Sequence, residues 1–112
     1  MGNSVAIKIT NRTQSDWSIT PTQGKNQIPC QQTTVIKLKK GQKYLLEDAS
    51  GQIDRQWIKI SEPVGYVQVT NGPAKITNQL KNVKISIPSP DEIQITPHNY
   101  VEPPIPSTLQ WM

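Results

Sequence analysis

Hydrophobic and polar residues alternate in short segments along most of the chain. In Ser4–Thr10 the side chains of Val5, Ile7 and Ile9 fall on one face, which is the pattern of a half-buried β-strand. Strands are also predicted at Asp16–Thr20, Thr33–Lys39, Lys43–Glu47, Ile53–Ile60, Gly65–Thr70, Ala74–Asn78, Asn82–Ile87 and Glu92–Thr96. No segment sustains a helical repeat over three turns, so the pattern predicts an all-β protein.

The stretch 33–60 is the most apolar and most basic part of the chain, and it predicts a three-stranded β-meander. Its two turns are placed at Gly41 and Gly51, because glycine adopts positive φ without a Cβ clash. Asn71-Gly72 predicts a hairpin, and Pro73 makes the segment after it an edge strand. Residues 21–32 are predicted to form a polar loop, because Pro21, Gly24 and Pro29 interrupt them.

Many short strands separated by turns predict an antiparallel β-sandwich, with a small, partly open β-barrel as the alternative. The long loop at 21–32 favours the sandwich, since it suits a crossover between two sheets. Twelve residues are predicted to share one interior: Val5, Ile7, Ile9, Ile36, Leu38, Ile58, Ile60, Val67, Val69, Val83, Ile85 and Ile87.

Length and composition place limits on this fold. The chain has 112 residues, which suits one domain, and only 34% of them are hydrophobic, so the core is expected to be thin. Cys30 is the single cysteine, which excludes an internal disulfide and a cysteine-based metal site. No apolar run has the length of a signal peptide or a membrane span. We therefore expect a cytoplasmic protein, unless it is incorporated into a virion or another large assembly, and no membrane partner.

Residues 97–112 differ from the domain predicted at 1–96. They contain four prolines and no Lys, Arg or Gly, which predicts an extended, polyproline-like C-terminal arm rising about 3.1 Å per residue. Large apolar residues are spaced through the arm, unlike in an ordinary disordered tail. The predicted partner-binding residues are Tyr100, Val101, Ile105, Leu109 and Trp111.

Charge is divided along the chain. Residues 1–90 carry a net charge of +7, whereas residues 91–112 carry three acids and no base. Interleaved basic and aromatic residues on a sheet can follow phosphates and stack bases. The candidate anion or nucleic-acid contacts are Lys37, Lys39, Lys40 and Lys43 at one predicted hairpin, with Arg55 and Lys59 on the adjoining strand. The alternative interpretation is that these lysines only protect a sheet edge from pairing.

Catalytic and metal-binding chemistry is poorly represented. His98 is the only histidine, and the adjacent carboxylates Glu47-Asp48 and Asp91-Glu92 point to opposite faces of their strands. No nucleophile-elbow, zinc-protease or phosphate-loop motif is present. The sequence therefore predicts no enzyme activity, no cofactor and no metal. Trp17, Tyr44, Trp57 and Tyr66 offer a third hypothesis, a stacking platform for carbohydrate.

The combined pattern favours a non-enzymatic structural or assembly subunit that docks through its arm onto neighbouring subunits or another protein. We expect a homo-oligomer or a component of a larger complex. A small, Gln/Thr/Asn-rich β protein with a terminal Pro-rich arm has the general style of accessory virion or phage proteins, although no motif carries that association. The alternatives are a nucleic-acid-binding β-barrel that uses the Lys-rich hairpin and a carbohydrate-binding module.

Overall fold

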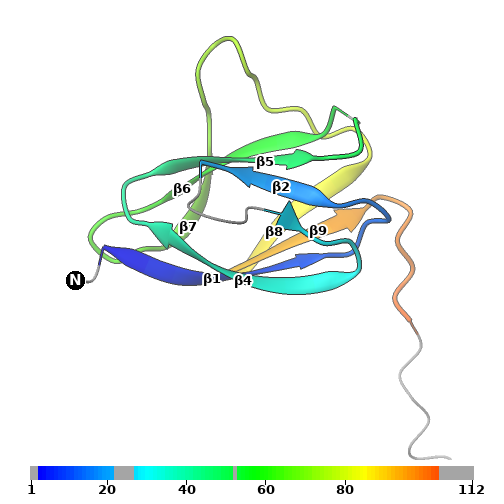
Figure 1. Ribbon diagram of the computed structural model, residues 1–112, viewed down its shortest axis with the longest axis horizontal. Helices are drawn as coiled ribbons and strands as arrows, with labels where there is room; N and C mark the ends of the chain where they lie inside the picture. The colour runs from blue at the N-terminus through cyan, green and yellow to red at the C-terminus, as the bar shows by residue number, and fades with distance from the viewer. Residues whose placement is uncertain (1–2, 22–26, 52, 104–112) are drawn as a thin grey trace, which may run out of the picture.

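The computed structural model describes residues 3–21, 27–51 and 53–103, and these form two stacked β-sheets (Figure 1). The first sheet has the strand order β4-β1-β9-β8 and the second β3-β2-β5-β6-β7, and no helix occurs in this part of the chain. The strands are β1 (Ser4–Asn11), β2 (Trp17–Thr20), β3 (Gln27–Ile28), β4 (Gln32–Lys39), β5 (Lys43–Asp48), β6 (Arg55–Ile60), β7 (Val67–Thr70), β8 (Val83–Ser89) and β9 (Glu92–Pro97). The all-β prediction is confirmed, and the two mostly antiparallel sheets agree with the predicted sandwich.

One pair departs from the antiparallel pattern. β1 and β9 run parallel, with Lys8 beside Glu92 and Asn11 beside Ile95. Alternation of apolar and polar residues is the same in parallel and antiparallel strands, so the sequence pattern does not distinguish them.

The meander predicted at 33–60 is confirmed for its last two strands, β5 and β6, which pair antiparallel, and is wrong for its first strand. β4 pairs with β1 in the first sheet, with Ile36 opposite Ile7, whereas β5 pairs with β6 in the second. The connection around Gly41 therefore crosses from one sheet to the other, and the N–H groups of Lys40 and Gly41 donate to Asn3 O and Ile60 O. Gly41 has a φ of 80°, so the turn itself was located correctly. The prediction that the two strands it connects pair with each other was wrong. Alternation defines the inward face of a strand and leaves its neighbour open.

Two further local predictions differ from the structure. β3 lies inside the predicted loop 21–32, and 74–78 contains no strand. After β7 the chain leaves the sheet at Asn71, passes over the outer face and returns at Gln79, which pairs with Arg55 (Figure 1). Gly72 forms no hairpin because it packs on Trp57, whose ring occupies the space that a side chain at position 72 would need.

The core lies between the two sheets. Seven of the twelve predicted residues are buried there: Ile7, Ile9, Leu38, Ile58, Ile60, Val67 and Val83. Val5, Ile36, Ile85 and Ile87 are half-buried against them. Val69 was predicted wrongly, because it lies on the edge strand β7 and is 55% exposed. The prediction omitted Trp17, Ile19, Ile28, Tyr44, Leu46, Ile93 and Ile95, which complete the interior.

Candidate functional site

The predicted basic hairpin does not exist as a hairpin. Lys37 and Lys39 lie on β4, an edge strand of the first sheet, and alternate with the buried Leu38. Lys43 and Lys59 lie directly opposite each other on β5 and β6 of the second sheet. The two pairs consequently face outward from opposite sides of the sandwich.

We call the surface formed by Lys37, Lys39, Lys40, Lys43 and Lys59 the basic end, because these residues flank the crossover between the sheets. Lys40 lies in the crossover itself. Lys43 Nζ donates to Asn71 O over 2.9 Å, and the other four lysines have no side-chain hydrogen bond or ion pair within the described ranges. Lys37 and Lys39 can protect the edge strand β4 from pairing, whereas Lys43 and Lys59 lie on the inner strands β5 and β6 and protect no edge. The positions of all five lysines are compatible with contact to an anion that wraps around the end.

Arg55 is not part of the basic end. It begins β6 at the opposite end of that strand, and its Nε donates to Thr77 O over 2.8 Å. The guanidinium therefore helps to hold the 71–78 segment in place.

Trp57 also helps to hold the 71–78 segment in place. Its Nε1 donates to Ile76 O over 2.9 Å, and its backbone N–H donates to Asn78 Oδ1 over 2.8 Å. Leu45, the cross-strand partner of Trp57, is buried outside the main core cluster. A second, small core thus forms on the outer face of the second sheet beneath residues 71–78.

The predicted carbohydrate platform is not formed. Trp17 and Tyr44 are buried, with exposed fractions of 0% and 4%, and Trp57 is packed beneath the 71–78 segment. Tyr44 Oη accepts the N–H of Lys39 over 2.8 Å, so its polar end is also committed. Tyr66 alone is exposed.

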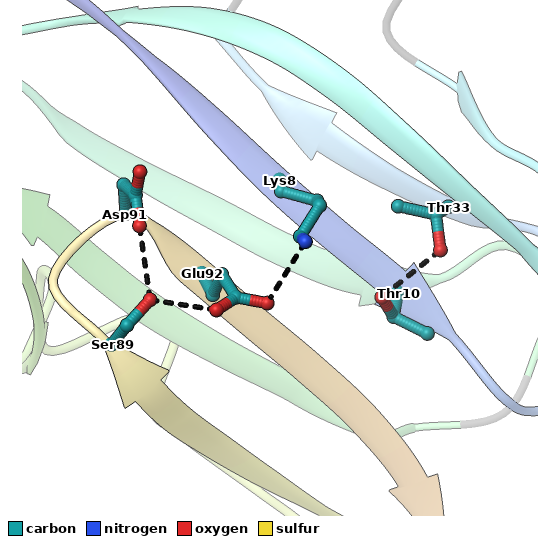
Figure 2. Close-up of polar contacts among 6 residues, drawn as sticks. All are labelled: Lys8, Thr10, Thr33, Ser89, Asp91 and Glu92. Carbon is teal, nitrogen blue, oxygen red and sulfur yellow. Dashed lines mark hydrogen bonds and ion pairs between the residues drawn. The ribbon is translucent and has the colours of Figure 1, made fainter.

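The outer face of the first sheet carries a row of paired polar groups (Figure 2). Lys8 Nζ lies 3.3 Å from Glu92 Oε2, and Ser89 Oγ lies 2.8 Å from Glu92 Oε1 and 2.9 Å from Asp91 Oδ1. The hydrogen bond from Ser89, with the contact to Lys8, lowers the pKa of Glu92. Both carboxylates are thereby engaged with neighbouring side chains.

The beginning of the arm belongs to the sandwich. Pro97 is the last residue of β9 and pairs with Val83, so the sheet includes the first residue of the arm that was predicted to begin at 97. The N–H of His98 donates to Asn82 O over 3.0 Å, and the Arg12 guanidinium lies 5.2 Å from the centroid of the Tyr100 ring. Tyr100 is half-buried, whereas Val101 is 81% exposed. The other predicted anchors, Ile105, Leu109 and Trp111, lie outside the described residues.

A cavity of about 700 Å³ opens beside residues 97–101, which we call the arm root. We call it the end groove, and its main polar lining residues are Arg12, Gln14, Gln31, Lys81, His98 and Asn99. Tyr100 lines it as well, and Asp48 contributes the one carboxylate among the lining residues. Residues from the β1–β2, β3–β4 and β7–β8 connections and from the arm root meet here. These segments are far apart along the chain, so the sequence does not reveal the groove. The only signal was the polar character of Asn11–Ser15 and of His98-Asn99.

Fully buried polar residues support the walls of the end groove. Asn11 is 0% exposed, and its Oδ1 accepts the N–H and the hydroxyl of Thr13 over 2.9 and 2.7 Å. Its Nδ2 donates to Ser15 O and Ile28 O, each over 3.0 Å. A buried amide that is satisfied in this way fixes the loop around it, since breaking any one bond leaves an unpaired group.

Asp54 supports the opposite wall in the same way. It is 1% exposed, its Oδ1 accepts the N–H groups of Lys81 and Asn82, and its Oδ2 accepts Asn82 Nδ2 over 2.7 Å. Burial on its own raises the pKa of Asp54, but the hydrogen bonds from Asn82 and Lys81, with the nearby charge of His98, outweigh burial and lower it. The carboxylate is therefore held ionised behind the groove.

The carboxylate of Asp48 is also engaged in hydrogen bonds. Its Oδ1 accepts hydrogen bonds from the hydroxyls of Ser15 and Ser50 over 2.9 and 2.7 Å, and from the N–H of Ser50 over 2.9 Å. No group of three or more His, Cys, Asp or Glu side chains suited to a metal ion occurs among the described residues. Within the same residues no helix is long and apolar enough to cross a membrane.

Comparison with known proteins adds no relative. No protein-family model matches the chain, and no curated protein or solved structure is detectably similar to it.

Proposed function

We propose that this protein is a non-enzymatic structural or assembly subunit that docks onto neighbouring subunits, or onto another protein, through its C-terminal arm. The observation that carries the proposal is the geometry of the arm root. The contacts of His98 and Tyr100 fix where the chain leaves the sandwich, and from Val101 onward the described residues are exposed. Figure 1 shows this segment turning away from the sheets at the end opposite the N-terminus.

The sequence beyond the arm root supports the same function. Proline at 103, 104 and 106 restricts the backbone, so less conformational entropy is lost on docking than for a flexible tail. Ile105, Leu109 and Trp111 provide apolar side chains of the kind that dominate binding at interfaces. An accessory role in a virion is one setting for such a subunit.

The test compares the full chain with a chain ending at Glu102. This end point keeps β9, His98 and the Arg12–Tyr100 contact, so it removes residues 103–112, with the anchors Ile105, Leu109 and Trp111, without cutting into the sandwich. We expect the full chain to self-associate, or to form a complex with its partner, with a sedimentation coefficient that rises with concentration. The shortened chain should remain a monomer with an unchanged melting temperature.

Single substitutions refine the test. Trp111→Ala should weaken association by at least about 2 kcal/mol, because aromatic anchors dominate interface energies. Gln110→Ala is the matched control within the arm and should have little effect. A shortened chain that melts at a much lower temperature, combined with a full chain that is monomeric at every concentration, would show that the arm belongs to its own domain and would contradict the proposal.

Nucleic-acid binding is the second candidate, and the Lys43–Lys59 pair is the observation in its favour. Like charges directly opposite each other destabilise a sheet, so an anionic partner would offset a cost that the free protein bears. The separation of the lysines onto two faces argues against a flat nucleic-acid platform. Binding that falls steeply as salt rises from about 50 to about 200 mM would support this candidate over the arm.

A further inference from the structure

We propose that the end groove is a binding site for a neutral carbohydrate chain, with Tyr100 as its stacking surface. The site differs from the platform that the sequence predicted, and it shares none of that platform's four residues. The inference also stands apart from the assembly role, since it depends on the sandwich and the arm root and not on residues beyond Glu102.

The charges around the groove are close to balanced. Arg12 and Lys81 on its walls are matched by Asp48, which lines it, and by Asp54, which lies buried behind Lys81 and Asn82. His98 lies within electrostatic reach of Asp54. A groove of this kind does not favour a highly charged ligand, because complementary recognition of an anion needs an excess of positive charge.

The available side chains suit hydroxyl groups. Gln14 and Asn99 are exposed, and their amides make no hydrogen bond within the described part of the chain. Gln31 uses its Nε2 to hold Arg12 O and Thr13 O over 3.1 and 2.8 Å, which leaves its Oε1 as an acceptor. An amide offers donors and an acceptor side by side, and a sugar hydroxyl can both donate and accept.

Tyr100 supplies the apolar part of the site. Arg12 lies over its ring at 5.2 Å and holds it in place, while the ring also lines the end groove. An aromatic ring presents a flat apolar surface together with a polar hydroxyl, and this combination matches the C–H face and hydroxyl rim of a sugar. Arg12 is accordingly a positioning residue for Tyr100.

The groove is also built before any ligand arrives. Its volume of about 700 Å³ lies in the range of small-molecule sites. Asn11 and Asp54, both almost completely buried, fix the backbone of Thr13 and of Lys81-Asn82 by hydrogen bonds. Preorganisation of this kind reduces the entropy lost on binding.

The experiment is a titration of the ¹⁵N-labelled full chain with maltohexaose, cellohexaose or chitohexaose, followed by amide chemical shifts. We expect at least one of these probes to shift the amides of Arg12–Gln14, Lys81–Val83 and His98–Val101 selectively. Tyr100→Ala should weaken binding at least about 10-fold, and Tyr100→Phe should retain it, because the ring is kept. Gln14→Ala combined with Asn99→Ala tests the amides without touching the packed ring.

Tyr66→Ala is the matched control, because Tyr66 is an exposed tyrosine outside the groove. The chain ending at Glu102 should bind the sugar as well as the full chain does, so a failure of the arm proposal leaves this result intact. The proposal is overturned if none of the three sugars gives localised shifts. Inorganic phosphate shifting the same amides as strongly would overturn it too, since the groove would then be an anion site.

Discussion

The basic end and the end groove use polar residues in opposite ways. At the basic end, exposed lysines extend from two sheets, and only Lys43 bonds to another described group, Asn71 O. At the end groove, Asn11 and Asp54 are buried, and each bonds to backbone groups and to one neighbouring side chain, that of Thr13 or Asn82. The density of charge therefore identified the basic end from the sequence. The buried, hydrogen-bonded polar side chains, in contrast, lie around the end groove.

Buried polar networks are costly to maintain, because each unsatisfied member destabilises the fold. An exposed lysine costs little and can be exchanged with little effect. Substitutions should therefore have much larger effects on stability around the end groove than at the basic end.

The largest effect is expected for Asn11→Ala. The change removes four hydrogen bonds and leaves the buried N–H of Thr13 without its acceptor, whereas the Thr13 hydroxyl keeps Ser15 O as an acceptor over 2.8 Å. The free energy of unfolding should therefore fall by about 3–4 kcal/mol. Urea unfolding followed by Trp fluorescence provides the measurement. Lys39→Ala is the control, with an expected change within about 0.5 kcal/mol, and a similar loss in both variants would contradict the comparison.

Asp54→Asn should have the next largest effect. The amide that replaces one carboxylate oxygen cannot accept from its donors, so the variant should lose about 2–3 kcal/mol at neutral pH. Amide exchange should also become faster at Lys81 and Asn82 than at Lys40. Unchanged exchange at Lys81 and Asn82 would show that Asp54 does not hold this wall.

The dependence of stability on pH should also show the contribution of Asp54. Because the pKa of Asp54 is lowered in the folded protein, its contribution to stability is present above its unfolded pKa of about 3.9 and is lost as pH falls through the folded value. We expect the wild type to lose stability below about pH 4 more steeply than Asp54→Asn does. Parallel pH profiles for the two proteins would exclude Asp54 as the group responsible.

The smallest effect on stability is expected from the fourfold exchange of Lys37, Lys39, Lys40 and Lys43 to Gln. The free energy of unfolding should change little, since the side chains are exposed or half-exposed. If the basic end contacts phosphates, the exchange should abolish retention by single- or double-stranded nucleic acid at about 50 mM salt. A wild type that shows no retention under these conditions would leave edge protection as the role of Lys37 and Lys39 on the edge strand β4.

Local chemistry in the sequence determined a good deal about this protein. Alternation in segments such as Ser4–Thr10 predicted strands and their inward faces, so Ile7, Ile9, Ile58 and Ile60 were identified as core. Gly41 marked a turn of positive φ, and the alternation of Lys37, Leu38 and Lys39 marked a strand with one exposed face. These features follow from a period of two residues and from the absence of a Cβ atom, both of which are local properties.

Only the tertiary structure decided which strands are neighbours. Hydrogen bonding between strands involves backbone groups that every residue except proline carries. Composition therefore does not specify that β4 pairs with β1, or that β9 runs parallel to β1. The exposure of Val69 and the role of Gly72 depended likewise on what lies across space from them. The end groove was beyond reach for the same reason: Asn11, Asp54 and His98 are separated by more than 40 residues at each step and meet only when both sheets have formed.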